Sequence, residues 1–271
     1  MCSAPRPAIA VSRKRIAVTQ SKLALVTGGN RGLGRSEALA LARTGVDVVI
    51  TFRSHDEEAA KVVAEVEALG RRAVALHLDT SAPETFAEFV ETLRAAIAST
   101  WNRDDLNVVV NNAGHAGWTP LGAIDVDVVR SLLDVHVVGV IMLTDALMPM
   151  VADGGRVINT STGLARFTGD FGYAVYAAAK GAVEVWTRYL AKELGPRRIT
   201  VNTIAPGATG TDFAGGVLRD NEAVRTGLAN VIAMGQVGDP DAIGSAVAAI
   251  ASDDMGWVTG QRLEASGGML L

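Results

Sequence analysis

The sequence predicts a single α/β domain of the doubly wound type, with a seven-stranded, mostly parallel sheet flanked by helices. Two observations predict it: short β-branched runs alternate with longer stretches of helical spacing, and several of these runs are apolar at consecutive positions. Consecutive apolar residues suit strands that are buried on both faces. Alternation of strands and helices is typical of a parallel sheet that is covered on both sides.

The predicted strands and helices alternate along the chain from residue 23 onward. The strands are expected at 23–26, 46–52, 73–78, 106–110, 156–160, 199–204 and 257–263. The helices are expected at 33–43, 57–69, 83–99, 128–151 and 173–194. Gly45 and Gly70 follow the first two helices, where glycine commonly ends a helix. Because no repeat or linker divides the chain, we expect one domain over residues 21–271, preceded by a disordered basic tail over residues 1–20.

The overall composition excludes several classes of protein. Hydrophobic residues make up 49% of the 271 residues and charged residues 20%, which is enough apolar content for a large core. The formal net charge of -4 comes without a basic patch in the domain that would suit a nucleic acid. No apolar run reaches the roughly 18 residues that a membrane-spanning helix needs. We therefore expect neither a nucleic acid nor a membrane as a partner.

The single cysteine and the charges of the first residues bear on the location of the protein. Cys2 has no second cysteine with which to form an internal disulfide, which predicts a reducing, cytoplasmic setting. Residues 1–20 contain four basic residues and no acidic one. An organellar transit peptide is the alternative to a disordered tail there, whereas the segment lacks the apolar core of a secretory signal.

A glycine-rich turn follows the first predicted strand directly. It reads TGGNRGLG over residues 27–34 and leads into a helix. A tight turn and a close approach of the backbone to a pyrophosphate both favour residues without a Cβ, and a helix N-terminus offers N–H groups to phosphate. An ordinary strand-to-helix turn is the alternative, but the position in an α/β chain favours a dinucleotide site. Its expected contacts are Gly28, Asn30, Arg31, Gly32, Leu33 and Gly34.

The end of the second strand indicates which dinucleotide would bind. A site for NAD usually has an acidic residue there to hold the ribose 2′-hydroxyl. Here Phe52 stands at that position and is followed by Arg53 and Ser54. With Arg31 in the glycine turn, Arg53 would suit a 2′-phosphate, since guanidinium pairs with phosphate through two hydrogen bonds. Two ordinary surface arginines are the alternative, but together they favour NADP(H).

Tyr176 and Lys180 stand four residues apart, which places both side chains on one face of a helix. The phenol of tyrosine has a pKa of about 10, too high for a base near neutral pH. A nearby lysine ammonium would lower that pKa, so the pair could act as a catalytic acid/base. The alternative is an amphipathic helix with one buried aromatic side chain and one solvated lysine. Tyr173 lacks such a partner, because Ala177 stands four residues after it.

These motifs, in this order, resemble the short-chain dehydrogenase/reductase family. The turn has the family's spacing Thr-Gly-x-x-x-Gly-x-Gly, residues 111–114 read Asn-Asn-Ala-Gly, and Tyr-x-x-x-Lys lies on the helix after the fifth strand. The resemblance extends from about Lys22 to the C-terminus and is closest to 3-oxoacyl-carrier-protein reductases and general ketoreductases. It implies a Rossmann-type domain, NADP(H) as the cofactor, and a homotetramer or homodimer.

The resemblance also implies cofactor contacts after the other strands. The adenosine half is expected at Asp79, Thr80, Asn112, Ala113 and Gly114. For Asp79, a helix cap is the alternative. The nicotinamide end is expected at Pro206, Gly207, Thr209 and Thr211. The following segment, about 212–234, is expected to be mobile and to close over the substrate, as the corresponding family segment does.

Two positions depart from the family's pattern. Thr162 falls at the position of the family's catalytic serine and offers the same hydroxyl, while Ser161 is the alternative and should point to the opposite face of the strand. His136 stands where the family has an asparagine that serves a proton-carrying water chain. The histidine could relay protons itself, given its near-neutral pKa. A packed histidine without a catalytic part is the alternative.

The resemblance implies reversible hydride transfer between NADP(H) and a small carbonyl or alcohol substrate. The expected catalytic residues are Tyr176, Lys180, Thr162 and His136. Two alternatives stay open: an NAD-dependent alcohol or sugar dehydrogenase on the same scaffold, and a non-catalytic NADP-sensing protein. A preference for NADH over NADPH would favour the NAD-dependent dehydrogenase. Turnover that depends on Tyr176 would exclude the non-catalytic sensor. No metal is expected, because the other histidines are scattered along the chain.

Overall fold

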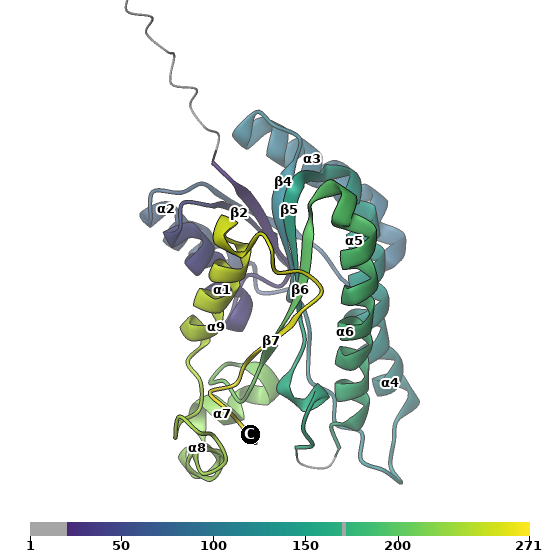
Figure 1. Cartoon of the computed structure of the whole chain (residues 1–271), viewed down its shortest axis with the longest axis vertical. Coiled ribbons are helices and arrows are strands. Elements are labelled where there is room, and N and C mark those ends of the chain that lie inside the picture. The colour runs from purple at the N-terminus through teal and green to yellow at the C-terminus, as the bar shows by residue number, and fades with distance from the viewer. Residues whose placement is uncertain (1–20, 170–171) are drawn as a thin grey trace, which may run out of the picture.

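The computed structural model describes residues 21–169 and 172–271, so the tail predicted for residues 1–20 lies outside the described part. Figure 1 shows one seven-stranded sheet with helices on both faces, in the order β3-β2-β1-β4-β5-β6-β7. Every neighbouring pair of strands is parallel, so a sheet predicted to be mostly parallel is parallel throughout. The strand order reverses between β1 and β4, which is where sheets of this type form a ligand crevice at their carboxyl ends.

Most strands lie close to their predicted positions. They are β1 (Leu23–Val26), β2 (Asp47–Phe52), β3 (Ala73–His77), β4 (Leu106–Asn111), β5 (Val151–Thr160), β6 (Thr200–Pro206) and β7 (Arg262–Ala265). The predicted start of the last strand at Trp257 is wrong. The chain is still turning there, the Trp257 side chain is 99% exposed, and pairing with β6 begins only at Arg262.

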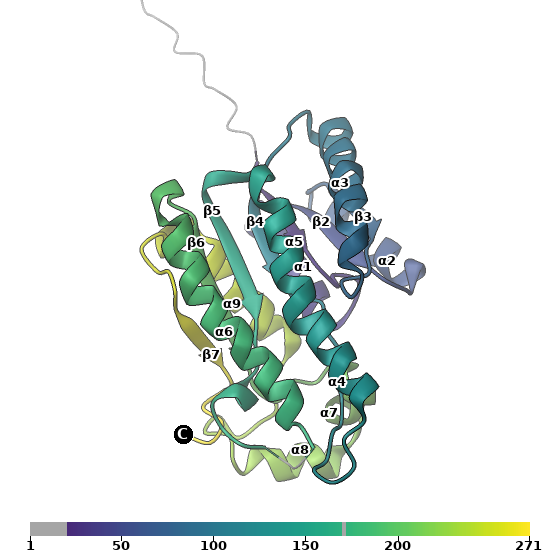
Figure 2. The ribbon, with the colours of Figure 1, turned by 90° about the vertical axis from the view of Figure 1, so that its right-hand side faces the viewer.

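The helices cover both faces of the sheet. They are α1 (Gly32–Arg43), α2 (Asp56–Ala68), α3 (Phe86–Trp101), α4 (Val126–Leu133), α5 (Gly139–Leu147), α6 (Ala174–Leu194), α7 (Val217–Asp220), α8 (Glu222–Ala229) and α9 (Pro240–Ala251). Figure 2 shows α3, α5 and α6 on one face, with α1 and α9 behind the sheet. In the described part of the chain, none of these helices combines the length and the apolar character that crossing a bilayer requires.

The single helix predicted over 128–151 is wrong in two respects. A π-helical turn (Asp134–Val138) separates α4 from α5, and it directs His136 into the interior. After α5 the chain forms a short 3-10 turn around Pro149, which lacks the N–H that a further α-helical turn needs. The chain then enters β5 at Val151.

Helix α9 was not predicted at all, although the sequence carries a start signal for it. Asp239 caps the helix by accepting a hydrogen bond from the backbone N–H of Asp241, and Pro240 occupies the first helical position. The helix contains five alanines, whose small side chains are spread around it, so its apolar face differs little in hydrophobicity from its other faces.

Two hydrophobic layers hold the helices to the sheet. Leu23 and Leu25 of β1 pack on the side of α3, α5 and α6, while Ala24 and Val26 pack on the side of α1, α2 and α9. All four residues are fully buried. The predicted burial of this strand on both faces is therefore confirmed, and the layers fix which side chains can reach the carboxyl end of the sheet.

Helices α1 and α9 approach each other closely at one glycine. A Cβ added to Gly244 would lie 2.4 Å from the carbonyl oxygen of Ser36. Because the obstacle is backbone, a side chain there would push the two helices apart. This contact therefore sets the position of α1, whose first residues form the glycine-rich turn.

We expect Gly244→Ala to lower the free energy of unfolding by about 1–3 kcal/mol, the usual cost of overpacking a tight contact. Urea denaturation of the purified chain measures it. The matched control is Gly227→Ala in α8, where no described atom lies within 4 Å of the added Cβ. The free energy of unfolding of that control should stay unchanged or rise by up to about 1 kcal/mol, because alanine has a higher helix propensity than glycine. Equal stabilities of the two variants would contradict the close packing.

Candidate active site

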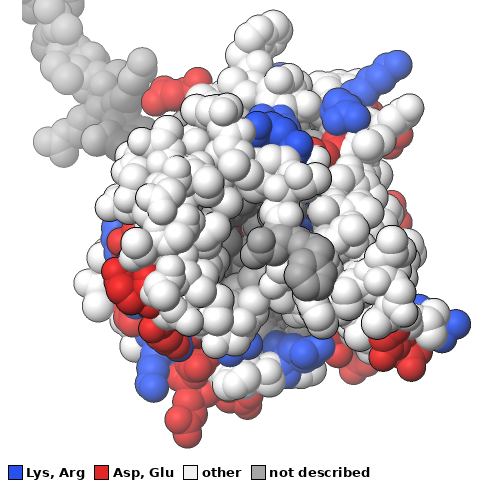
Figure 3. Space-filling model, turned by 90° about the horizontal axis from the view of Figure 1, so that it is seen from below, with Lys and Arg blue, Asp and Glu red and all other residues white. Residues whose placement is uncertain are grey.

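The residues singled out by the sequence gather at the carboxyl end of the sheet, at the bottom of Figure 1. Gly28 follows β1, Asn112 follows β4, Thr162 follows β5 and Gly207 follows β6. Figure 3 looks onto this end of the molecule and shows a mostly uncharged central surface, with charged side chains at its rim. Parallel strands place their carboxyl ends side by side, so segments far apart in the sequence meet here.

The glycine turn is packed too tightly for side chains. Gly28 has a positive φ of 63°, and a Cβ on Gly34 would lie 2.3 Å from the Gly28 carbonyl oxygen. The Asn112 amide supports the turn from behind by donating to Thr27 O at 2.9 Å and Gly28 O at 3.3 Å. Helix α1 begins at Gly32, so its first N–H groups point out of this turn. This cradle without side chains fits the pyrophosphate of a dinucleotide.

The corner between the glycine turn and the end of β2 brings Arg31 and Arg53 to one side of the site. The Asn30 side chain connects the glycine turn with the segment after β2 by donating a hydrogen bond to Ser54 O at 3.0 Å. Both arginines are exposed, and neither forms an ion pair with another residue of the described chain. Arg53 lies close enough to Asp79 for its charge to lower the pKa of that carboxyl. Two exposed guanidinium groups without an ion pair at this corner fit a phosphate on the adenosine ribose.

The other predicted cofactor residues lie around the same cradle. Asp79 accepts hydrogen bonds from the N–H and hydroxyl of Ser81 at 2.9 and 2.6 Å, so it stabilises a turn rather than capping a helix. Thr211 lies next to the glycine turn, with its Cβ 3.7 Å from the position of a Cβ on Gly32. Thr209 folds back to donate to Gly207 O at 3.1 Å. Contacts of these residues with a cofactor stay predictions.

Tyr176 and Lys180 lie on one face of α6, directed at the end of β5. The Lys180 ammonium donates to Thr160 O at 2.6 Å, and the Thr162 hydroxyl lies close enough to the Tyr176 phenol to lower its pKa. All three site side chains are buried, with 4% exposure for Lys180, 7% for Tyr176 and 8% for Thr162. The structure therefore brings together a phenol, a hydroxyl and a cation beside the glycine cradle.

Ser161, the alternative to Thr162, points the other way. Its hydroxyl donates to Glu184 Oε1 at 2.6 Å, on the side of the strand that faces the middle of α6. Successive side chains of an extended segment alternate between faces, so only one of the two hydroxyls can face Tyr176. Between the two candidates, the geometry favours Thr162.

Burial controls the protonation of this group. It raises the pKa of the Tyr176 phenol, although the adjacent Thr162 hydroxyl lowers it in part. Burial also lowers the pKa of Lys180 to about 8, against an opposing effect of Glu37. The sequence predicted that Lys180 would lower the tyrosine pKa. In the structure burial raises that pKa instead, and the ammonium is directed at Thr160 O.

His136 lies in the π-helical turn, fully buried and next to Tyr176. The two ring centroids are 5.3 Å apart in an edge-to-face arrangement, and Nε2 lies 2.8 Å from His115 O, to which it donates. Burial, followed by the charge of Lys180, lowers the pKa of His136 to about 2. The near-neutral pKa on which a proton relay through this ring was predicted is therefore wrong. The ring also packs on Gly114, where a Cβ would lie 2.5 Å from its Cε1.

The segment 212–234 lies over the site, but it is more regular than the sequence suggested. It contains the short helices α7 and α8. Phe213 at its start places its ring 5.7 Å from that of Tyr176 and remains 40% exposed. An aromatic side chain thus borders the candidate reaction centre.

Among the described residues, no group of three or more His, Cys, Asp or Glu side chains could hold a metal ion.

Glu37 is a buried carboxyl group that the sequence pattern did not predict. It lies on α1 with 0% exposure, and neither carboxylate oxygen has a hydrogen-bond partner among the described residues. Burial raises its pKa to about 8, partly offset by the charge of Lys180. The only signal in the sequence was an acidic residue among the alanines and leucines of a helix, a pattern that usually marks an exposed position.

Comparisons with known proteins agree with this geometry. A family model described as "Enoyl-(Acyl carrier protein) reductase" matches residues 28–270. An uncharacterized oxidoreductase of Methylorubrum extorquens is 36% identical over 253 residues, covering 92% of this chain and 98% of that one. Tetrahydroxynaphthalene reductase PfmaG of Pestalotiopsis fici is 32% identical over 257 residues, covering 91% of each. The crystal structure of angucycline C-6 ketoreductase LanV with bound NADP has a TM-score of 0.87 and 32% identity, covering 93% of this chain and 96% of that one.

Glu37→Gln should make the chain more stable at pH 8 but not at pH 4.5. The carboxyl pKa is raised from 4.5 to about 8 on folding, so between these values the unfolded chain releases a proton that the folded chain keeps. Stability is therefore full below about pH 4.5 and is lost as the pH rises toward 8, by about 1.4 kcal/mol per pH unit and roughly 4 kcal/mol in all. Glutamine does not titrate, so the Glu37→Gln variant does not lose stability in this way as the pH rises.

Urea denaturation of both chains from pH 4.5 to 8 measures the difference. The exposed Glu57→Gln on α2 controls for the substitution itself. A stability difference between wild type and Glu37→Gln that stays constant over this range would show that Glu37 does not keep its proton in the folded chain.

Proposed function

Because this chain belongs to the short-chain dehydrogenase/reductase family, we propose that it is an NADP(H)-dependent ketoreductase. The observation that carries the proposal is the burial of the Tyr176 phenol, the adjacent Thr162 hydroxyl and the Lys180 ammonium in one group. A phenol and a hydroxyl that converge on one point suit the oxygen of a carbonyl group. The bound NADP of the LanV structure supports the choice of cofactor.

Each of the three side chains has a distinct part in the proposed reaction. Thr162 holds the carbonyl oxygen, and Tyr176 gives that oxygen its phenolic proton. Lys180 supplies a buried positive charge that stabilises the phenolate left behind. NADPH, when bound in the cradle, supplies the hydride that completes the alcohol. Because burial raises the pKa of Tyr176, the phenol holds a proton to give, which favours reduction over oxidation.

We also propose that the substrate is an apolar or aromatic ketone. The Phe213 ring lies 5.7 Å from that of Tyr176 at the reaction centre. The surface at this end of the molecule is mostly uncharged in its central part (Figure 3). PfmaG is named as a tetrahydroxynaphthalene reductase and LanV as an angucycline C-6 ketoreductase. A 3-oxoacyl thioester is the second candidate, supported by the acyl-carrier description of the family model.

The assembly and location expected from the sequence belong to the same proposal. Met142 on α5 and Val185 and Tyr189 on α6 are 46%, 47% and 66% exposed. Burying such apolar side chains against a second copy of the chain would stabilise a homodimer or homotetramer. We place the enzyme in the cytoplasm, on the cysteine argument from the sequence.

The proposal predicts NADPH oxidation with ketones that disappears in Tyr176→Phe. A panel of bicyclic aromatic ketones and β-ketoacyl thioesters, assayed with NADPH and NADH side by side, measures it. We expect the phenylalanine variant to lose at least about 10³-fold in kcat, since it removes the proton donor. Tyr189→Phe on the exposed face of α6 is the matched control and should keep full activity. Unchanged turnover by Tyr176→Phe would contradict the assignment, and binding of NADP(H) without turnover would favour the sensor.

The corner formed by Arg31 and Arg53 predicts the preference for NADPH. We expect Arg31→Ser and Arg53→Ser each to raise KM for NADPH about 10-fold or more, with little change for NADH, because each removes a charge-assisted hydrogen bond to the 2′-phosphate. Steady-state kinetics with both cofactors measures this. Arg35→Ser is the control, because Arg35 already pairs with Glu65 at 2.7 Å. A wild-type preference for NADH would point to the alternative of an NAD-dependent dehydrogenase.

A further inference from the structure

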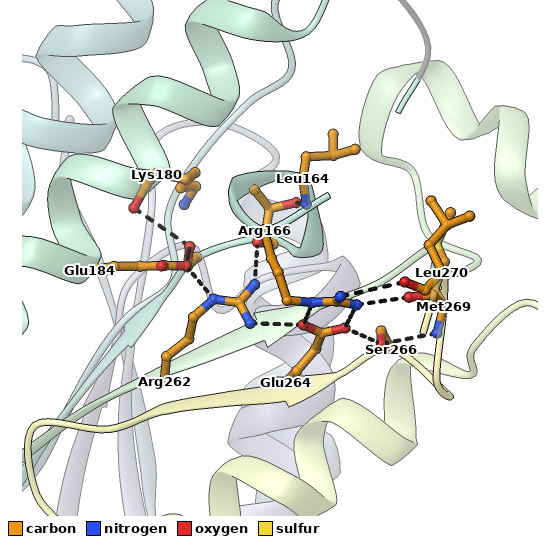
Figure 4. A network of polar contacts seen from close by, with 11 residues as sticks. Leu164, Arg166, Lys180, Glu184, Arg262, Glu264, Ser266, Met269 and Leu270 are labelled. Carbon is orange, nitrogen blue, oxygen red and sulfur yellow. Dashed lines mark hydrogen bonds and ion pairs between the residues drawn. The ribbon is translucent and has the colours of Figure 1, made fainter. Parts of the chain in front are cut away.

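A polar network connects the end of β5 with α6, β7 and the C-terminus. Figure 4 shows Arg262 and Glu264 on β7, Glu184 on α6 and Arg166 in the turn after β5, all pointing toward one another. None of these residues belongs to the cofactor cradle or to the group of Tyr176, Lys180 and Thr162. The network therefore calls for a role of its own.

Arg262 is the centre of this network. Its guanidinium donates through Nε to Glu184 Oε1 at 2.7 Å, through Nη1 to Glu264 Oε2 at 2.8 Å and through Nη2 to the backbone oxygen of Thr162 at 3.1 Å. The side chain of Arg262 is 21% exposed, and those of Glu184 and Glu264 are 13% and 19% exposed. One planar side chain thus connects two strands and a helix.

The bonds to Thr162 and Glu184 fix the short segment that carries the proposed catalytic hydroxyl. Ser161 is held on two sides, since its N–H donates to Ile204 O of β6 at 2.7 Å and its hydroxyl donates to Glu184 Oε1 at 2.6 Å. Arg262 holds the next residue by its carbonyl oxygen. Fixing the peptide of Thr162 sets the direction in which its side chain leaves the backbone, and its hydroxyl also accepts a hydrogen bond from the Leu164 N–H at 3.3 Å.

We propose that Arg262 is a positioning residue for Thr162 and that Glu184 holds Arg262 in place for this task. The inference rests on the proposed function, because it concerns the hydroxyl that receives the substrate oxygen. Partly buried ion pairs contribute little net stability, since desolvation offsets their attraction. Orientation has a larger effect, because an error of about 1 Å in a reacting group can cost about 100-fold in rate.

Arg166 has a different place in the same network. It pairs with Glu264 through Nη2 at 2.8 Å and donates to the backbone oxygens of Met269 at 2.8 Å and Leu270 at 3.4 Å. It therefore holds the C-terminal segment rather than the peptide of Thr162. Arg166 shares the partner Glu264 with Arg262 but makes no hydrogen bond to Thr162. Arg166→Gln is therefore the matched control.

A double-mutant cycle between Arg262→Gln and Thr162→Ala tests the inference. On the ketone that the wild type reduces best, Arg262→Gln should lower kcat about 10- to 100-fold and change KM for NADPH less than about 2-fold. In the Thr162→Ala background it should cost no more than about 2-fold further, because it acts through that hydroxyl. Arg166→Gln should have the same effect on kcat in both backgrounds. Thermal melts compare the folding of all variants.

Arg262→Lys separates positioning from folding. A lysine keeps the charge next to Glu184 but has one nitrogen in place of the planar fork, so it should restore the melting temperature and leave kcat low. It also replaces Arg262→Gln in the cycle if the glutamine variant fails to fold. Equal, additive losses in both backgrounds would overturn the inference while the proposed function stands. Absence of wild-type turnover with every ketone would overturn the proposed function, and this inference with it.

Discussion

The hydrogen bond from the Lys180 ammonium to Thr160 O is the contact on which the rest of the candidate site depends. It sets the register of α6 against the end of β5. One helical turn before Lys180, Tyr176 then meets Thr162, and one turn after it Glu184 meets Ser161. The alternation of Ser161 and Thr162 along the strand decides which hydroxyl faces the reaction. A single register thus positions the proton donor, the hydroxyl and the cation together.

Burial of this group then determines its chemistry. A buried phenol resists ionisation and a buried ammonium tends to lose its proton, so the same environment raises the pKa of Tyr176 and lowers that of Lys180. Tyr176 therefore holds a proton to donate, as reduction of a carbonyl requires. His136, buried next to it, is neutral at physiological pH and packs against Gly114. Its substitution for the family's asparagine leaves a ring that fills space where the sequence suggested a proton carrier.

Local patterns predicted much of this molecule. The glycine turn, most strands and the Tyr176–Lys180 pair could be read from the sequence because tight turns, consecutive apolar residues and helical spacing are encoded over a few residues. The π-helical turn at His136 and the burial of Glu37 depend on neighbours that are distant in the sequence. The same holds for Arg262, which bonds to a residue 100 positions away. Helix α9 was missed because its small residues blur the apolar face that marks a helix.

In the proposed reaction, Tyr176, Thr162 and Lys180 deliver a proton to a carbonyl oxygen while its carbon receives hydride from NADPH. Reduction of a ketone with NADPH deuterated at the transferable C4 position tests this most directly. We expect an alcohol that carries one deuterium on its carbinol carbon, in a single stereochemical configuration, and no label taken up there from deuterated water. Solvent label at that carbon, or an unlabelled product, would contradict it.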